Sequence, residues 1–300
     1  MRFFLTGAAG FSGFHLTQYL AQQGHTLFAQ FRGAEKALAR AKQNYSSSQQ
    51  VLDDSITWID SDLTEVTSLP SQLDGLIHLA ATSPGRNQKT GEFVRDNVLG
   101  TAVIARLCRE FQVPKVLYFS SLSVNGVVTS PLVDEQTPII NPDAYGATKF
   151  IGEKLFEEQA PEVATLVLRL PALLGRGATR NWIVRTAHQA LRNEMITIFN
   201  PDASFDNSVD IDDLCVFVSK ILNFQLGGFD VVTVAAAGQM TIKEVVELMI
   251  LKLKSSSKIV VQTPPPRIAT RVSSEKAIRL YNYNPRPVRE MIEKYLKTLM

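Results

Sequence analysis

The sequence has 300 residues, of which 45% are hydrophobic, and its 31 basic and 29 acidic side chains give a formal net charge of +2 at pH 7. This near-neutral balance argues against nucleic acid as a partner. No uncharged apolar stretch approaches the roughly 18 residues of a membrane span, so we expect a soluble, cytoplasmic protein without a membrane partner. The two cysteines and four histidines lack the spacing of metal ligands, which predicts no bound metal.

The first expected element is a strand at residues 2–6, a short apolar run. Three glycines at the spacing G-x-x-G-x-x-G follow it, and an apolar helical segment continues to Gln23. Glycine permits a tight turn and a close approach of the backbone, and the first N–H groups of a helix bind anions. A strand, such a turn and a helix together hold the pyrophosphate of a dinucleotide. We therefore assign this turn to cofactor binding, through Gly7, Gly10, Phe11, Ser12 and Gly13.

Strand-like and helix-like segments then alternate along the first half of the chain. The expected strands are 27–31, 56–60, 76–81, 116–119 and 165–170, and the expected helices are 92–111 and 144–158. This alternation implies parallel strands joined by right-handed crossovers. We predict an α/β fold: a doubly wound parallel sheet of the Rossmann type with a smaller C-terminal α/β lobe that binds the substrate.

The alternation loosens after Pro171, and one further buried strand is expected at 229–235. We assign residues 1–172 to a dinucleotide-binding domain, to which 206–236 return. Residues 173–205 and 237–300 form the predicted substrate-binding lobe.

Acid–base chemistry is indicated at the start of the expected helix 144–158. Tyr145 and Lys149 lie four residues apart and therefore share one helix face. A nearby ammonium lowers the pKa of a phenol, which is about 10 when unperturbed, so that the phenol exchanges a proton with a carbonyl–alcohol couple. The strand before this helix ends in serines, placed where a substrate oxygen would be held.

Together these motifs make the chain similar to the extended short-chain dehydrogenase/reductases of the NAD-dependent epimerase/dehydratase (nucleotide-sugar-modifying) family, over roughly residues 1–240. The resemblance implies that Ser121, Tyr145 and Lys149 are catalytic, that Asn97 positions the lysine, and that Lys149 also binds the cofactor. It implies further cofactor contacts from Asp62, Leu63, Ala80 and Ala81. Family members often dimerise through the helices that hold Asn97 and Tyr145, so we expect a homodimer.

Two departures from the family pattern bear on the cofactor and the reaction. In NAD-preferring members an acidic residue ends the second strand, whereas here Phe31 is followed by Arg32. Because an arginine suits a 2′-phosphate, we expect Arg32 to bind the cofactor and the cofactor to be NADP(H) rather than NAD(H). Leu122-Ser123 replaces the Asp-Glu pair of the dehydratase members, which disfavours dehydration.

A third departure concerns the substrate, which the resemblance implies is a nucleotide sugar. Asp206 stands where many members have an arginine that meets the substrate pyrophosphate. Arg267 or Arg271 is the candidate to supply the missing charge. The candidate substrate contacts are Ser123, Asn125, Asn181, Arg267 and Arg271.

The expected function is that of an NAD(P)-dependent oxidoreductase of a nucleotide sugar, with NADPH-linked reduction of a keto-sugar favoured and a place in polysaccharide biosynthesis. One alternative is a nucleotide-sugar 4-epimerase that retains its cofactor. A second is a reductase of a non-sugar carbonyl, which Asp206 favours. A third is a non-catalytic NADP-sensing protein, against which the presence of both Tyr145 and Lys149 argues.

Overall fold

The structure is a computed structural model that describes residues 1–45, 53–85, 88–160, 162–263 and 270–300. The chain packs into two compact units. The first unit contains Met1–Val127, Pro138–Arg169 and Val218–Val232, and the second contains Val128–Thr137, Leu170–Phe217 and Thr233–Met300.

The first unit alternates strands with helices and short helical turns. Its elements are β1 (Arg2–Thr6), α1 (Phe11–Gln22), β2 (Thr26–Phe31), α2 (Ala34–Tyr45), η1 (Asp53–Ser55), β3 (Ile56–Asp60), η2 (Leu63–Glu65), β4 (Gly75–His78), α3 (Thr90–Phe93), η3 (Val94–Leu99), α4 (Gly100–Glu110), β5 (Lys115–Ser121), η4 (Leu122–Asn125), α5 (Ala144–Glu157), β7 (Ala164–Leu170) and β12 (Phe229–Thr233).

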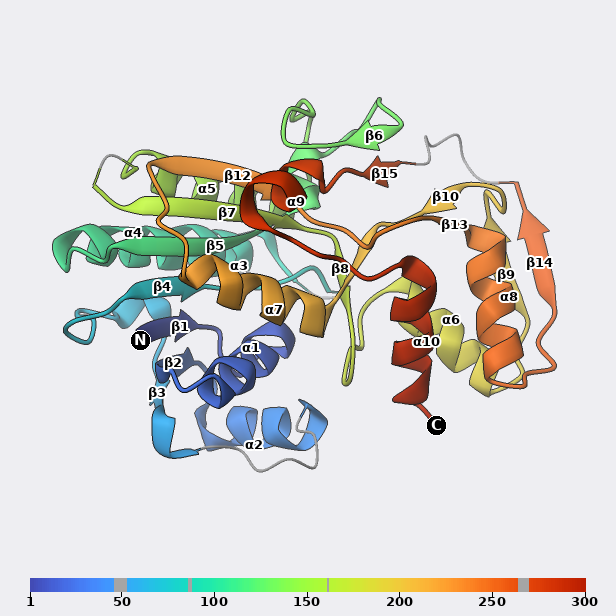
Figure 1. The fold of residues 1–300 in the computed structure, drawn as a ribbon, viewed down its shortest axis with the longest axis horizontal. Coiled ribbons are helices and arrows are strands. Elements are labelled where there is room, and N and C mark those ends of the chain that lie inside the picture. Colours follow the sequence, from blue (N-terminus) through green and yellow to red (C-terminus); the bar gives the residue numbers. More distant parts are fainter. Residues whose placement is uncertain (46–52, 86–87, 161, 264–269) are drawn as a thin grey trace. The chain divides into compact units, whose positions relative to one another are not determined.

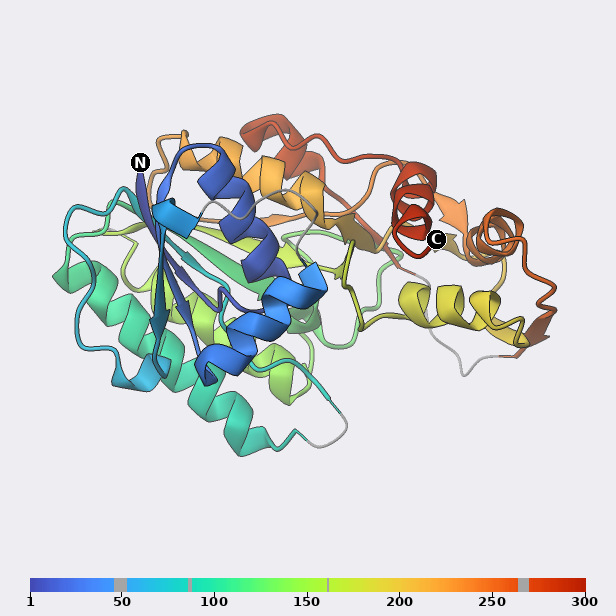
Figure 2. The ribbon, with the colours of Figure 1, turned by 90° about the horizontal axis from the view of Figure 1, so that it is seen from below.

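Seven strands form one sheet in the order β12-β7-β5-β4-β1-β2-β3 (Figure 1). β1 pairs in parallel with β2 and with β4, so that Leu5 is in register with both Ala29 and Ile77. These strands read as apolar runs because helices cover both faces of the sheet. Helices α1 and α2 lie over one face and α4 and α5 over the other (Figure 2). The predicted doubly wound sheet of the Rossmann type is therefore confirmed.

The core beneath α4 and α5 joins those helices to the sheet. Large side chains from β1, β5 and α5 meet there, and smaller ones from α4 fill the space between them. The buried members include Phe4, Tyr118, Phe156, Ile104 and Cys108.

The expected helix over residues 92–111 is interrupted. It begins as α3, continues as the π-helical stretch η3, and becomes α-helical again in α4. A π-helical turn carries one extra residue per turn and is frequent at functional sites. Here it contains Asn97, a polar residue that is fully buried, so the interruption lies at a predicted site residue.

The second unit contains short strands and four complete helices among its described residues. Its elements are β6 (Leu132–Val133), β8 (Ala172–Leu174), α6 (Trp182–Leu191), β9 (Ile196–Phe199), β10 (Ser204–Phe205), β11 (Ser208–Asp210), β13 (Met240–Thr241), α8 (Ile242–Lys252), β14 (Ile259–Gln262), β15 (Arg271–Val272), α9 (Glu275–Tyr281) and α10 (Val288–Lys297). The strands pair two by two, as β10-β13, β11-β8, β14-β9 and β15-β6.

The division into units differs from the predicted domains over residues 128–137, 170–172, 206–217 and 233–236. β11 pairs in parallel with β8, within the second unit, whereas β12 joins the seven-stranded sheet. Helix α7 (Ile211–Leu222) runs from the second unit into the first. The part of 206–236 that belongs to the first unit is thus Val218–Val232.

None of the helices in the described part of the chain combines the length and the apolarity that crossing a membrane requires.

Candidate active site

The glycine turn between β1 and α1 has the close packing expected of a phosphate-binding turn. Gly7 has a φ of +70°, and a Cβ atom there would lie 2.8 Å from the Cα atom of Ala80. A Cβ atom on Gly13 would lie 2.2 Å from the carbonyl oxygen of Gly7. Neither position therefore accepts a side chain, and the turn stays compact.

The N-terminus of α1 is open in the way an anion site requires. Its N-cap is Gly10, and among the described residues no side chain caps the helix and no acidic residue lies in its first turn. The unpaired N–H groups of a helix start and its dipole favour a phosphate. The turn therefore fits the pyrophosphate of a dinucleotide. Ser12 lies in this first turn, and the Phe11 ring packs edge-on against His15.

The residues after β4 close the other side of the turn. The Thr6 hydroxyl accepts hydrogen bonds from the N–H groups of Leu79 and Ala80, each at 3.1 Å. This places Ala80 against Gly7, with Ala81 following it. The side chain of Leu63 is buried in the core beneath α4, so its predicted cofactor contact stays a prediction that its backbone would have to fulfil.

Arg32, directly after β2, is bound by two carboxylates. Its two terminal nitrogens donate to Asp96 at 2.9 and 2.8 Å, and one of them also donates to Asp62 at 2.9 Å. Asp62 also caps η2, accepting from the Thr64 N–H at 3.0 Å. Burial alone would raise the pKa of Asp96, but hydrogen bonds from Arg32, Arg95 and Thr82 hold it well below its usual range.

Asn97 joins three segments of the first unit. Its side-chain oxygen accepts from the Thr82 N–H at 2.7 Å, and its side-chain nitrogen donates to the Thr82 carbonyl oxygen at 3.1 Å. The same nitrogen donates to the Thr148 hydroxyl at 3.2 Å. Asn97 therefore ties η3 to the loop after β4 and to α5, one residue before Lys149.

Helix α5 starts where its capping residue dictates. The Asp143 carboxylate accepts from the Gly146 N–H at 2.7 Å, and this N-cap puts Tyr145 in the first turn and Lys149 in the second. Burial raises the pKa of Tyr145, and its hydrogen bond with Ser121 offsets part of that increase. Ser121, at the end of β5, therefore lies near enough to Tyr145 to affect its pKa.

Lys149 is almost fully buried, with 1% of its surface exposed. Its ammonium lies 4.2 Å from the centroid of the Tyr118 ring, an arrangement that stabilises a buried cation. Burial lowers the pKa of Lys149 to about 7, and the charge of Glu153 acts in the opposite direction. The predicted lowering of the Tyr145 pKa by Lys149 stays a prediction, because burial dominates the Tyr145 pKa here.

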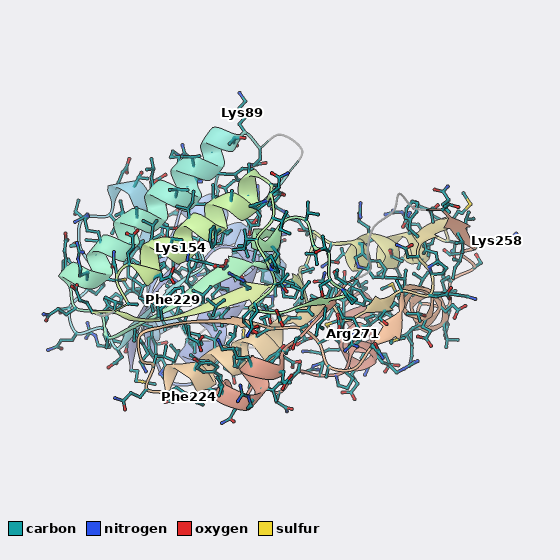
Figure 3. The ribbon with its side chains drawn as sticks, turned by 90° about the horizontal axis from the view of Figure 1, so that it is seen from above. Lys89, Lys154, Phe224, Phe229, Lys258 and Arg271 are labelled. Atoms are coloured by element: carbon teal, nitrogen blue, oxygen red, sulfur yellow. The ribbon has the colours of Figure 1, made fainter. Side chains whose placement is uncertain are left out.

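The remaining candidate residues lie in different places. Ser123, in η4, accepts from the Ser121 hydroxyl at 3.2 Å, and Asn125 is buried at the end of η4. Asn181 belongs to the second unit, where it caps α6 by accepting from the Val184 N–H at 2.8 Å. Arg271, labelled in Figure 3, lies on β15 of that unit. Arg267 lies outside the described residues.

Arg271, a candidate to supply the charge of the missing arginine, is paired with Asp206, the residue that stands in that arginine's place. Its Nε atom lies 3.5 Å from a carboxylate oxygen of Asp206, and the Val272 N–H donates to Asp206 at 3.1 Å. Burial raises the pKa of Asp206, against the effect of these contacts. Part of the Arg271 charge is therefore balanced within the chain.

Two further groups were missed in the sequence. Asp96 was overlooked although it directly precedes Asn97. Glu153 and Arg169 form a buried ion pair at 2.8 Å, and Glu153 acts on the pKa of Lys149. The available signal was a glutamate four residues after Lys149 together with an arginine inside an apolar strand. Within the described residues, no group of three histidine, cysteine or acidic side chains is arranged to hold a metal ion.

A model of the NAD dependent epimerase/dehydratase family matches residues 3–235. Among curated relatives, the D-erythronate dehydrogenase of Cupriavidus necator is 31% identical over 190 residues, which cover 60% of this chain and 58% of that protein. The UDP-glucose 4-epimerase of Halalkalibacterium halodurans is 28% identical over 158 residues, which cover 52% of this chain and 45% of that protein. The chain thus matches about half the length of these two relatives.

Solved structures share the fold along the whole chain. The UDP-glucuronic acid 4-epimerase from Bacillus cereus in complex with NAD has a TM-score of 0.83 at 23% identity and covers 100% of this chain and 99% of its own. MoeE5 in complex with UDP-glucose and NAD has a TM-score of 0.79 at 22% identity and covers 100% of this chain and 98% of its own.

The prediction that NADP(H) is favoured over NAD(H) is wrong. Both of these solved structures hold NAD. The prediction depended on a free Arg32, but Arg32 is engaged by Asp62 and Asp96. A guanidinium already paired with carboxylates is a poor site for a 2′-phosphate, so the missing acidic residue at the end of β2 does not indicate NADP.

Proposed function

Because the chain belongs to the NAD dependent epimerase/dehydratase family, we propose that it is an NAD-linked enzyme that oxidises a secondary alcohol of a sugar substrate and returns the hydride, as a nucleotide-sugar 4-epimerase. The observation that carries this proposal is the buried Lys149, one helical turn along α5 from Tyr145, whose pKa Ser121 lowers from the end of β5. These groups and the glycine turn belong to the same compact unit.

The three side chains divide the proton chemistry between them. A bound NAD supplies the acceptor for hydride. The Tyr145 oxygen takes the proton of the substrate hydroxyl as the carbon is oxidised, and returns it when the carbon is reduced. Ser121 hydrogen-bonds the reacting oxygen and so fixes its position. Lys149 in its charged form stabilises the phenolate.

The ionisation of Lys149 limits this arrangement at neutral pH. Its pKa of about 7 means that the ammonium and the neutral amine are both populated there. Glu153, one turn further along α5, favours the ammonium. We therefore assign Glu153 a positioning and electrostatic role rather than contact with the substrate.

We propose a nucleotide sugar as the substrate, in line with the UDP-sugar epimerases among the relatives. Ser123 and Asn125 of the first unit are the proposed contacts near the reacting carbon. The second unit is the proposed substrate-binding lobe, with Arg271 as its proposed recognition residue. The proposed contact through Asn181 is weaker, because its side chain already caps α6.

A second candidate function is a dehydrogenase of a sugar acid without a nucleotide. Two observations favour it: the relative from Cupriavidus necator is a D-erythronate dehydrogenase, and Asp206, a buried carboxylate, stands where an arginine for the substrate pyrophosphate was expected. For this function, the Arg271 guanidinium is the proposed partner of the substrate carboxylate.

A substrate panel separates the two functions. The protein is incubated with NAD and with UDP-glucose, UDP-glucuronic acid or D-erythronate, and both the NADH absorbance and the sugar products are followed. Exchange of 4-epimers without net NADH supports the epimerase. Stoichiometric NADH with D-erythronate supports the dehydrogenase. If neither the epimers nor NADH form with any of the three, the proposal is wrong for these substrate classes.

We also propose that the protein acts as a homodimer. Three apolar side chains, Val94 and Leu99 of η3 and Ile151 of α5, are exposed on the helices predicted to form the interface. A second copy of the chain would remove them from water. Analytical ultracentrifugation tests this, and a monomer at micromolar concentration contradicts it.

A further inference from the structure

Arg32 lies at the edge of the sheet that the glycine turn also occupies. It directly follows β2, and β2 is the neighbour of β1, which Gly7 directly follows. The carboxyl ends of neighbouring parallel strands share one edge. A dinucleotide whose pyrophosphate lies on the glycine turn therefore extends its adenosine half across the end of β2, next to Arg32.

Asp96 reaches this position from a distant element. It belongs to the π-helical stretch η3, 64 residues beyond Arg32. Its side chain is 8% exposed, whereas that of Arg32 is 46% exposed. The Thr82 hydroxyl and the Arg95 Nε atom, at 2.7 Å, also donate to the Asp96 carboxylate. Asp96 is thus anchored, and the more exposed guanidinium is held against it.

The geometry of the contact makes the pair strong. Both Asp96 oxygens accept from Arg32, at 2.9 and 2.8 Å, in the two-pronged arrangement of the best arginine–carboxylate pairs. The hydrogen bonds with Asp96 and Asp62 raise the pKa of Arg32 further above its ordinary value. Two arginines, 32 and 95, face two aspartates, 62 and 96, so the formal charges of the cluster cancel.

We propose that Asp96 is the residue that makes this chain select NAD over NADP, an inference that rests on the proposed NAD-linked function. The carboxylate that strand β2 lacks is supplied by η3, and it withholds Arg32 from a 2′-phosphate. A 2′-phosphate would have to displace Asp96 from Arg32 and then remain beside two carboxylates. The 2′-hydroxyl of NAD carries no charge and meets neither obstacle.

Dinucleotide binding by isothermal titration calorimetry tests this assignment directly, without any assay of activity. The wild-type protein is titrated with NAD and with NADP and is expected to bind NAD more tightly. Asp96→Asn keeps the size of the side chain but removes its charge. We expect this variant to bind NADP about tenfold more tightly than the wild type, the effect of one charge-assisted hydrogen bond, and to bind NAD within about threefold of it.

Two further variants make the result specific. In Arg32→Ala/Asp96→Asn the gain in NADP affinity is expected to vanish, because the gain depends on the freed guanidinium. Glu92→Gln removes the same charge from the preceding helix α3, where the carboxylate accepts from the Lys89 N–H instead. It is expected to leave both affinities unchanged. If Asp96→Asn unfolds, Asp96→Ser, which also removes the charge, replaces it.

The failure of this proposal differs from the failure of the proposed function. If Asp96→Asn binds NAD normally and its NADP affinity is that of the wild type, Asp96 does not set the preference, while the NAD-linked function stands. If the gain persists without Arg32, the proposed mechanism of selection is wrong. If the wild-type protein binds neither dinucleotide, the proposed function and the assignment of Asp96 both fall.

Discussion

Glu153 and Arg169 form a buried, two-pronged ion pair between α5 and β7. The Arg169 nitrogens lie 2.8 and 3.1 Å from the two carboxylate oxygens, and the side chains of Arg169 and Glu153 are 6% and 3% exposed. The Ser120 hydroxyl donates to the same carboxylate. Since Glu153 also acts on the pKa of Lys149, the pair connects the packing of the sheet with the charge of the candidate active site.

Glu153→Gln is expected to destabilise the protein by about 3–5 kcal/mol, because it leaves the charge of Arg169 buried without a carboxylate. Unfolding in urea measures the loss. The matched control is Glu157→Gln, which breaks the exposed pair with Lys154 and is expected to change the free energy of unfolding by less than about 1 kcal/mol. Restoration of most of the loss in Glu153→Gln/Arg169→Met identifies the unpaired charge as the cause; equal losses in Glu153→Gln and Glu157→Gln would contradict the account.

Tyr145→Phe is expected to lower the turnover number about 100- to 10,000-fold, because the phenol oxygen is the group that exchanges the proton. NAD affinity, measured by calorimetry, should stay within about threefold of the wild type, since the glycine turn is untouched. Tyr281→Phe, on α9 of the second unit, is the control and should retain full activity. A Tyr145→Phe variant with wild-type turnover removes Tyr145 from the mechanism.

Lys149 makes stability depend on pH in a direction that the structure fixes. Its pKa is about 7 in the folded chain against 10.5 ordinarily, so between these values the unfolded chain binds a proton that the folded chain does not. The contribution of Lys149 to the free energy of unfolding therefore increases with pH, by up to about 1.4 kcal/mol per pH unit, between about pH 7 and about pH 10.5. Below about pH 7 this contribution is lowest and does not change with pH.

Comparison with Lys149→Met isolates this contribution from the other titrating groups. The variant should be the more stable protein at neutral pH, and its advantage should shrink as the pH approaches about 10. Urea unfolding of both proteins at a series of pH values gives the difference. A difference that does not change with pH shows that Lys149 is not the source.

Gly10→Ala tests the phosphate-binding turn. Gly10 has an ordinary extended backbone, and an added Cβ atom would meet the Gly7 carbonyl oxygen at 3.2 Å, so the fold should survive with a slightly tighter turn. The methyl group stands where the backbone approaches the pyrophosphate, so NAD affinity should fall at least about tenfold. Gly91→Ala, with nothing within 4 Å of its added Cβ atom, is the control and should bind NAD normally. If Gly10→Ala binds NAD as tightly as the wild type does, the assignment of the turn to phosphate binding is wrong.

The sequence was most informative where a signal is local. The apolar strands and the glycine turn between β1 and α1 were readable because each depends on a few adjacent residues and on burial on both faces of the sheet. The interruption of the expected helix 92–111 was not, because the residues that hydrogen-bond to Asn97 in the π-helical stretch, Thr82 and Thr148, lie far from it in the sequence. The second unit was equally hard to read, since its pair β15-β6 joins segments far apart in the chain.

Arg32 shows why the cofactor was misjudged. Two local features of the sequence indicate NADP: an arginine follows the second strand, and no carboxylate ends that strand. The carboxylate that pairs with Arg32 comes from Asp96, 64 residues away, and no local sequence pattern predicts that contact. The burial of the Leu63 side chain against α4 could not be predicted for a similar reason, since it depends on packing between segments far apart in the chain.

The most direct test of the account follows the NADH absorbance after rapid mixing of the NAD-loaded protein with UDP-glucose, UDP-glucuronic acid or D-erythronate. The wild-type protein should form NADH, transiently if it is an epimerase, with at least one of them, and Tyr145→Phe should form it at least about 100-fold more slowly. NADH formation by Tyr145→Phe at the wild-type rate would contradict the central claim that Tyr145 takes the proton of the substrate.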